Sequence, residues 1–200
     1  MGNANFPYTS SGSTSSGVCL SNYGPNGGAP TATCTNGVWG AVSRPCIMLT
    51  CAAETVDGTW FPVTNAGTSA TGTCQSGWSG SGARACNGNG VWAAPTATCT
   101  RIYCSQQKID TATFPSTPSN TPATGTCDAG YSGSPSSTCS ASGVWGPVSN
   151  ACTRIVCSAF NDLANNVQWP QTNALSTATG TCAAGFQGTP TRECTAMGAW

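Results

Sequence analysis

Residues 99–157 read CTRIYCSQQKIDTATFPSTPSNTPATGTCDAGYSGSPSSTCSASGVWGPVSNACTRIVC, and this stretch decides the fold. Within it, four cysteines are separated by 23, 12 and 13 residues, and the preceding stretch repeats the same three spacings. The two sets are Cys51, Cys74, Cys86 and Cys99, and Cys104, Cys127, Cys139 and Cys152. Each cysteine recurs after 53 residues, which indicates a tandem repeat.

Residues other than cysteine keep the same register. An aromatic residue followed by proline stands thirteen residues before each second cysteine, at Phe6-Pro7, Phe61-Pro62, Phe114-Pro115 and Trp169-Pro170. A Gly-aromatic-x-Gly turn follows that cysteine at 77–80, 130–133 and 185–188. The first repeat breaks this pattern with Asn22-Tyr23-Gly24. A Gly-x-Trp follows the third cysteine in all four repeats, so the repeat involves the whole unit and not the cysteines alone.

The register predicts four small modules joined by four-residue linkers. The modules span 1–46, 51–99, 104–152 and 157–200, and the linkers are 47–50, 100–103 and 153–156. Each linker contains isoleucine and another large apolar residue, so we expect it to pack against both neighbouring modules and to stiffen the junction.

The glycine and proline content indicates the fold class. The chain has 25 glycines and 13 prolines, which interrupt every stretch before a stable helix of about 12 residues is reached. Short strands remain, and we predict them around 71–74, 83–86 and 91–92 and at the equivalent positions of the other modules. The sequence therefore predicts an all-β protein.

Composition places the chain among disulfide scaffolds. It has 14 cysteines but only 12 formally charged side chains. Modules of about 50 residues bury too little surface to be stable without staples, and structural disulfides persist in oxidising compartments. We therefore expect an extracellular or cell-surface protein. The residues alone leave three connectivities open for each four-cysteine module.

The combination of motifs resembles the sushi family, also called complement control protein modules. The features that carry the resemblance are four cysteines per module, the Gly-aromatic-x-Gly turn, the Gly-x-Trp and the short link, and they cover nearly the whole chain. The resemblance implies sushi-like β modules in an elongated array, each with a tryptophan packed between its sheets. These module-core tryptophans are Trp39, Trp92, Trp145 and Trp200. The 23-residue interval is shorter than we expect for the family, so a strand or loop is trimmed.

The resemblance also implies the disulfides, because sushi modules pair the first cysteine with the third and the second with the fourth. Carried over, this gives Cys19 with Cys46, Cys51 with Cys86, Cys74 with Cys99, Cys104 with Cys139, Cys127 with Cys152, and Cys157 with Cys194. Cys34 and Cys182 are left unpaired or available for an intermolecular bond. We expect the chain to be a window from a longer array, or its end modules to be completed by neighbouring chains.

The residues argue against catalysis. The chain has no histidine, so Ser-His and Cys-His nucleophile pairs are absent. Of the six acids, Asp57, Asp110 and Asp162 recur five or six residues after a first cysteine, which favours a repeated turn residue over a catalytic pair. No CxxC pair or histidine indicates a metal site, so we expect neither enzyme activity nor a cofactor.

Two sets of repeated residues have alternative interpretations. Trp78, Tyr131 and Phe186 follow a turn glycine, and either cap each small core or form a ladder that contacts carbohydrate. Arg101 and Arg154 occupy equivalent linker positions, where they either bridge adjacent modules or remain solvated.

Charge and hydropathy limit the partners. Net charge is zero and the six basic residues are dispersed, which argues against nucleic-acid binding. No apolar run approaches the roughly 20 residues that a membrane span needs. No Asn-x-Ser/Thr sequon occurs, while the Ser/Thr-rich stretches 9–16 and 111–126 are candidates for O-linked glycans.

Two functional hypotheses are consistent with these features. The first is a structural protein that self-associates head to tail into a homopolymer, a rigid fibre or surface appendage, since heterologous contacts that do not close build open helices. The second is an adhesin or receptor-like binding protein of complement-control type. Monotonous, weakly charged modules favour the first.

Overall fold

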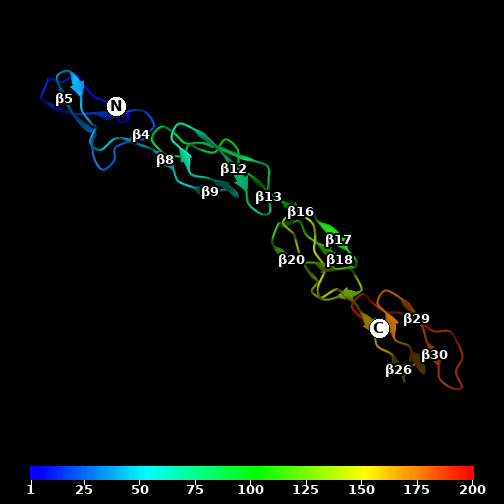
Figure 1. Ribbon diagram of the computed structural model, residues 1–200. Helices are drawn as coiled ribbons and strands as arrows, with labels where there is room; N and C mark the ends of the chain where they lie inside the picture. The colour runs from blue at the N-terminus through cyan, green and yellow to red at the C-terminus, as the bar shows by residue number, and fades with distance from the viewer. The chain divides into compact units, whose positions relative to one another are not determined.

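The computed structural model describes residues 1–200 and is all-β, with strands of two to six residues and no helix (Figure 1). It accordingly offers no helix long and apolar enough to span a membrane. The chain divides into two compact units, Met1–Arg101 and Ile102–Trp200. Each unit contains two of the predicted modules, called here the first to fourth repeats. That each repeat folds by itself stays a prediction.

The first unit contains fifteen strands. They are β1 (Ala4–Asn5), β2 (Thr14–Ser16), β3 (Val18–Cys19), β4 (Tyr23–Gly24), β5 (Thr31–Thr35), β6 (Val38–Trp39), β7 (Ile47–Met48), β8 (Thr50–Cys51), β9 (Glu54–Val56), β10 (Thr59–Phe61), β11 (Thr64–Asn65), β12 (Ser69–Cys74), β13 (Trp78–Ser79), β14 (Gly82–Ala85) and β15 (Thr100–Arg101).

The largest sheet belongs to the second repeat and has the order β14-β12-β10-β9, with all pairs antiparallel. Val56 and Thr59 pair across a two-residue turn formed by Asp57 and Gly58, whose φ angles are 45° and 68°. Two consecutive positive φ angles are those of a type I′ hairpin turn, which favours Asp-Gly. Asp57 is therefore a turn residue, as its recurrence predicts.

The second unit contains sixteen strands. They are β16 (Tyr103–Cys104), β17 (Gln107–Ile109), β18 (Ala112–Phe114), β19 (Thr117–Pro118), β20 (Pro122–Thr124), β21 (Thr126–Cys127), β22 (Tyr131–Ser132), β23 (Ser136–Thr138), β24 (Thr153–Arg154), β25 (Val156–Cys157), β26 (Phe160–Asp162), β27 (Val167–Trp169), β28 (Thr172–Asn173), β29 (Thr177–Thr179), β30 (Thr181–Cys182) and β31 (Thr191–Glu193).

The third and fourth repeats share one topology. Each has a three-stranded sheet, β17-β18-β21 or β26-β27-β30, and a separate two-stranded pair, β20-β23 or β29-β31. The second repeat joins the corresponding strands into one sheet because β12 is continuous from Ser69 to Cys74. In the third and fourth repeats the same stretch is divided at Gly125 and Gly180, which no strand includes.

Six disulfides staple the repeats, with Cα–Cα distances of 5.6 to 5.9 Å. They join Cys19 to Cys46, Cys51 to Cys86, Cys74 to Cys99, Cys104 to Cys139, Cys127 to Cys152, and Cys157 to Cys194. These are the pairs that the resemblance implies, and Cys34 and Cys182 remain free. So many disulfides suit an oxidising environment, extracellular or secreted.

Each repeat has a small aromatic core. Phe61 and Phe114 are fully buried, and their rings lie 5.8 and 5.2 Å from those of Trp92 and Trp145. Phe6 with Trp39, and Trp169 with Trp200, form the corresponding pairs at 5.2 and 5.8 Å. The four module tryptophans are only half-buried. In the second, third and fourth repeats the deepest aromatic is therefore the residue before proline, whereas in the first repeat Phe6 and Trp39 are both half-buried.

The predicted strands are found with one difference. Those near 71–74 and 83–86 are β12 and β14. At 91–92 Trp92 makes only an isolated bridge with Cys86, and a strand forms only at the equivalent Val38–Trp39. The Trp92 side chain is instead fixed by its indole N–H, which donates to the carbonyl oxygen of Ala52 at 2.8 Å.

Candidate functional site

The two free cysteines each line an open groove. Cys34 is buried in the first repeat beside a groove of 330 Å³ that Phe6, Trp39 and residues 7–11 also line. In the second repeat, the residues equivalent to Thr9 and Ser10 form β11, which pairs with the linker strand β8. Residues 9 and 10 belong to no strand, so this groove lies where the later repeats hold a linker strand.

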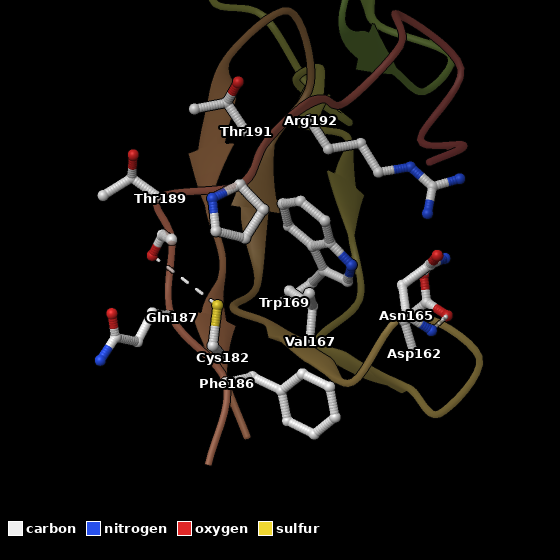
Figure 2. Close-up of a pocket in the computed structure, with 12 residues that line it drawn as sticks. Asp162, Asn165, Val167, Trp169, Cys182, Phe186, Gln187, Thr189, Thr191 and Arg192 are labelled. Atoms are coloured by element: carbon white, nitrogen blue, oxygen red, sulfur yellow. Dashed lines mark hydrogen bonds between the residues drawn. The ribbon is translucent and has the colours of Figure 1, made fainter. Parts of the chain in front are cut away.

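The second groove lies in the fourth repeat and measures 660 Å³. Figure 2 shows Trp169 at its centre, with Cys182 to one side, Asp162 and Asn165 to the other, and Phe186 at the lower edge. The Cys182 sulfur lies 3.7 Å from the carbonyl oxygen of Gly188. Trp169 is 7% exposed, and its indole N–H has no hydrogen-bond partner.

The equivalent region of the second repeat is closed by its own chain. Residues 93–99 run across it: the amide of Thr96 donates to the carbonyl of Ala83 at 2.9 Å, and the amide of Cys99 donates to Oγ1 of Thr59 at 2.7 Å. The Cys74–Cys99 disulfide ties the segment down.

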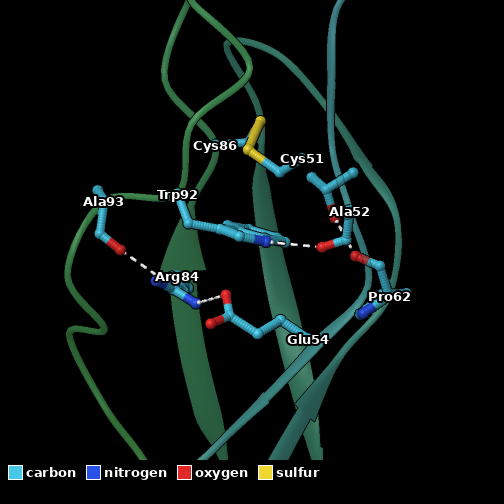
Figure 3. Close-up of polar contacts among 9 residues, drawn as sticks. Cys51, Ala52, Glu54, Pro62, Arg84, Cys86, Trp92 and Ala93 are labelled. Carbon is cyan, nitrogen blue, oxygen red and sulfur yellow. Dashed lines mark hydrogen bonds and ion pairs between the residues drawn. A yellow bond between two sulfur atoms is a disulfide. The ribbon is translucent and has the colours of Figure 1, made fainter.

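A polar cluster holds the start of this covering segment in the second repeat (Figure 3). Arg84, whose side chain is 11% exposed, donates from Nε to the carbonyl of Ala93 at 2.6 Å and from Nη1 to Glu54 at 2.6 Å. Its guanidinium also lies 5.2 Å from the Trp92 ring centroid. Arg192 occupies the equivalent position in the fourth repeat, where it lies over Phe160 at 5.6 Å.

Inside the first unit, the linker between repeats belongs to both of them. Its strand β7 pairs with β4 of the first repeat, and β8 pairs with β11 of the second. Between these strands, the amide of Leu49 donates to the carbonyl of Asn22, and its own carbonyl accepts from the amide of Ala66, both at 2.9 Å. The Leu49 side chain packs on the Cys51–Cys86 bridge.

The second unit repeats this junction. Strand β24 pairs with β22 of the third repeat and β25 with β28 of the fourth. Ile155 takes the place of Leu49: its amide donates to the carbonyl of Gly130 and its carbonyl accepts from the amide of Ala174, both at 2.9 Å. Its side chain packs against the buried cluster of Cys157, Ala174 and Cys194. The expectation that linkers pack on both neighbours is thus met at these two junctions.

The turn aromatics and linker arginines form pairs. Arg101 lies 5.6 Å from the ring centroid of Trp78. Arg154 lies 5.3 Å from the ring of Tyr131 and donates to its hydroxyl at 3.0 Å. Trp78 and Tyr131 are half-buried under these arginines, whereas Phe186 is 55% exposed. Trp78 and Tyr131 therefore do not form a bare ladder, and Arg101 and Arg154 each lie on the aromatic ring of the preceding repeat.

Asp128 and Asp162 form an ion pair and local hydrogen bonds at the surface. Lys108 and Asp128 form an ion pair at 2.8 Å. Asp162 accepts from the side-chain amide of Asn165 at 2.9 Å and from its backbone amide at 3.2 Å, and the side-chain bond above all lowers the pKa of Asp162. No cluster of three or more metal-ligating side chains is present.

Sequence reasoning missed the Arg84 cluster and the unpartnered indole of Trp169. Both had a signal in the register. Arg84 and Arg192 stand two residues before a third cysteine, and Trp169 replaces the phenylalanine of the three other repeats.

No protein-family model matches the chain, and no curated protein sequence matches it.

Proposed function

We propose that the chain is a structural protein of the extracellular space or cell surface, built from tandem sushi-like modules that self-associate head to tail into a rigid fibre or appendage. The observation that carries this proposal is the shared linker. At each junction inside a unit, four residues form two strands, one paired with each flanking repeat, and an apolar side chain fills the space between them.

A shared linker restricts bending because rotation of one repeat against the next would break backbone hydrogen bonds and expose Leu49 or Ile155. The cysteine content and the exposed serines and threonines suit an extracellular polymer that carries O-linked glycans.

Electron microscopy of native, non-reduced material tests the proposal. Regular filaments with an axial period equal to a whole number of repeats are the expected result. Monodisperse single chains under the same conditions, at concentrations up to the solubility limit, would refute it. Reduction of the sample before imaging is the control that separates disulfide-linked assembly from non-covalent assembly.

An adhesin is the second candidate, and one exposed aromatic favours it. Trp60 is 45% exposed on the sheet of the second repeat, where it pairs with Thr55 and Thr73 on the two neighbouring strands. A flat ring flanked by hydroxyls is suited to stacking on a sugar. Binding on a glycan array that Trp60→Ala abolishes, and that Thr113→Ala at the equivalent position of the third repeat preserves, would favour this function.

A further inference from the structure

The first repeat has a longer loop than the others, and an apolar groove lies against it. Six residues, 25–30, separate β4 from β5, whereas two separate β13 from β14 and three separate β22 from β23. Between this loop and β3 lies a groove of 380 Å³. Its lining side chains are those of Val18, Cys19, Pro25, Ala29 and Pro30, and none of them is polar. Val18 is 74% exposed, so this apolar surface is in contact with water.

The fourth repeat departs from the common spacing at a different turn. Four residues, 163–166, separate β26 from β27, whereas two residues separate the corresponding strands of the second and third repeats. Leu163 stands in this longer turn and is 85% exposed. Asp162 fixes the turn, because its carboxylate accepts from both the backbone amide and the side-chain amide of Asn165 (Figure 2). The turn therefore presents an apolar side chain in a conformation that is already ordered.

The exposure of this turn is a property of the repeat itself. Asp57 and Asp110 stand in the corresponding turns of the second and third repeats and are exposed as well, although each of these repeats is followed by another. A single exposed leucine is common on protein surfaces and does not by itself indicate a partner. What indicates one is that the chain also contains an apolar groove without an occupant, and that the leucine and the groove both arise from departures from the repeat.

The charges beside the two features are opposite. Arg44 lies at the groove, since a Cβ added to Gly28, which is one of the lining residues, would be 2.5 Å from its Nη1. Arg44 is exposed and forms no ion pair. Asp162 directly precedes Leu163 and carries a negative charge at neutral pH. A contact that places the leucine in the groove brings the acid toward the arginine, which favours this orientation over others.

We propose that Leu163 of one copy of this chain inserts into the apolar groove of the first repeat of a second copy, with Asp162 beside Arg44. This rests on the proposed structural function, for which it is a contact between successive chains. The turn and the groove are different surfaces, so the contact is heterologous and copies can be added one after another. The fourth repeat of one chain then lies beside the first repeat of the next.

The test uses the full chain with Cys34→Ala and Cys182→Ser, called here the parent protein, in which no free thiol can link two chains. Two further variants each block one side of the contact. Leu163→Ser removes the apolar side chain from the turn. Ala29→Glu places a charge on the groove wall, at an exposed position where a larger side chain displaces nothing in the core.

Each blocked variant has a matched control in the parent protein. Met197→Ser removes an apolar side chain that is 90% exposed in another turn of the fourth repeat. Asn26→Glu adds the same charge to the same loop, at an exposed residue that does not line the groove. Sedimentation velocity of all five proteins, at equal concentration, measures their association.

We expect the parent protein and both controls to polymerise and each blocked variant to remain monomeric. An equimolar mixture of the two blocked variants retains one intact turn and one intact groove, so it is expected to form dimers and nothing larger. Polymers of either blocked variant, or a mixture that stays monomeric while the parent protein polymerises, would overturn the proposal.

A peptide titration separates this contact from the fate of the fibre. The probe is the backbone-cyclised peptide FNDLANNVQW, residues 160–169, added to the parent protein while the methyl resonances of Val18 and Ala29 are followed by NMR. Saturable shifts are expected, with binding about tenfold weaker or more for the peptide carrying Leu163→Ser, because the buried leucine side chain is lost. Equal binding of the two peptides, or no binding, would refute the contact even if the protein forms polymers. Selective binding by a protein that forms no polymer would leave the groove assignment in place and refute the fibre.

Discussion

The two disulfides of a repeat are expected to contribute unequally, although their loops are similar in length. In the third repeat, Cys104–Cys139 closes 35 residues and Cys127–Cys152 closes 25. The chain-entropy relation gives about 3.8 kcal/mol for the longer loop and about 3.5 kcal/mol for the shorter. Loop closure alone therefore predicts a difference of only about 0.3 kcal/mol between the two bridges.

The burial of one disulfide enlarges the difference between the two bridges in their contribution to stability. Cys104 and Cys139 are both 0% exposed, whereas Cys127 and Cys152 are half-buried. Replacing the buried pair by alanine leaves two cavities of about methylene size, at about 1 kcal/mol each, while water fills the space at the outer pair. We expect Cys104→Ala/Cys139→Ala to cost about 5–6 kcal/mol and Cys127→Ala/Cys152→Ala about 3.5 kcal/mol.

Hydrogen exchange read by mass spectrometry measures these losses repeat by repeat. A difference of about 2 kcal/mol corresponds to amide exchange in residues 104–152 that is roughly 30-fold faster in the variant lacking the buried bridge. Peptides from residues 51–99 are the internal control and are expected to keep their protection. Equal exchange in the two variants, or faster exchange in the variant lacking the outer bridge, would refute the reasoning from burial.

Two further predictions concern turns. Gly58→Ala is expected to lower the free energy of unfolding by about 2–4 kcal/mol, because φ is +68° and a Cβ would lie 2.1 Å from the Trp78 ring. Gly37→Ala, at φ +79° with open space around it, is expected to lower it by about 1 kcal/mol. Thermal unfolding of the two variants compares these losses. The lowered pKa of Asp162 means that its bonds to Asn165 are fully present above the usual pKa of 3.8 and are lost as pH falls through the lower folded value. NMR titration of the Asn165 amide down to strongly acidic pH reads this loss, and an amide shift that is complete above the usual pKa would contradict it.

The fold class was predictable because it depends on local features. Gly and Pro exclude long helices, and the turn residues mark where strands end, as at Asp57-Gly58 between β9 and β10. The strand predicted at 91–92 does not form, and its absence was not predictable in the same way. Cross-strand partners decide such short strands, and Trp92 is held by its ring and indole N–H more than by a ladder.

The candidate sites were less predictable because they depend on contacts between distant residues. Glu54 and Arg84 are 30 residues apart. The arginine recurs as Arg192 but its acidic partner does not recur, so the register marks the arginine and not the ion pair. The register of the cysteines identified the two free ones, but the grooves beside them depend on the three-dimensional packing of residues distant in sequence. Spacing does not select among cysteine connectivities, so the pairing within a repeat came from the family resemblance and not from the residues alone.

The length of the linker has a structural reason that connects the repeat to the proposed function. Two linker residues form the strand that pairs with the preceding repeat. The strand that pairs with the next repeat ends at the first cysteine of that repeat. Leu49 or Ile155 lies between these two strands. Because successive residues of a strand face opposite sides, inserting one residue would turn either the apolar side chain or the cysteine away from its partner. A constant linker is therefore what a fibre of stapled repeats requires. Flexible attachment of independent binding modules would tolerate linkers of varied length.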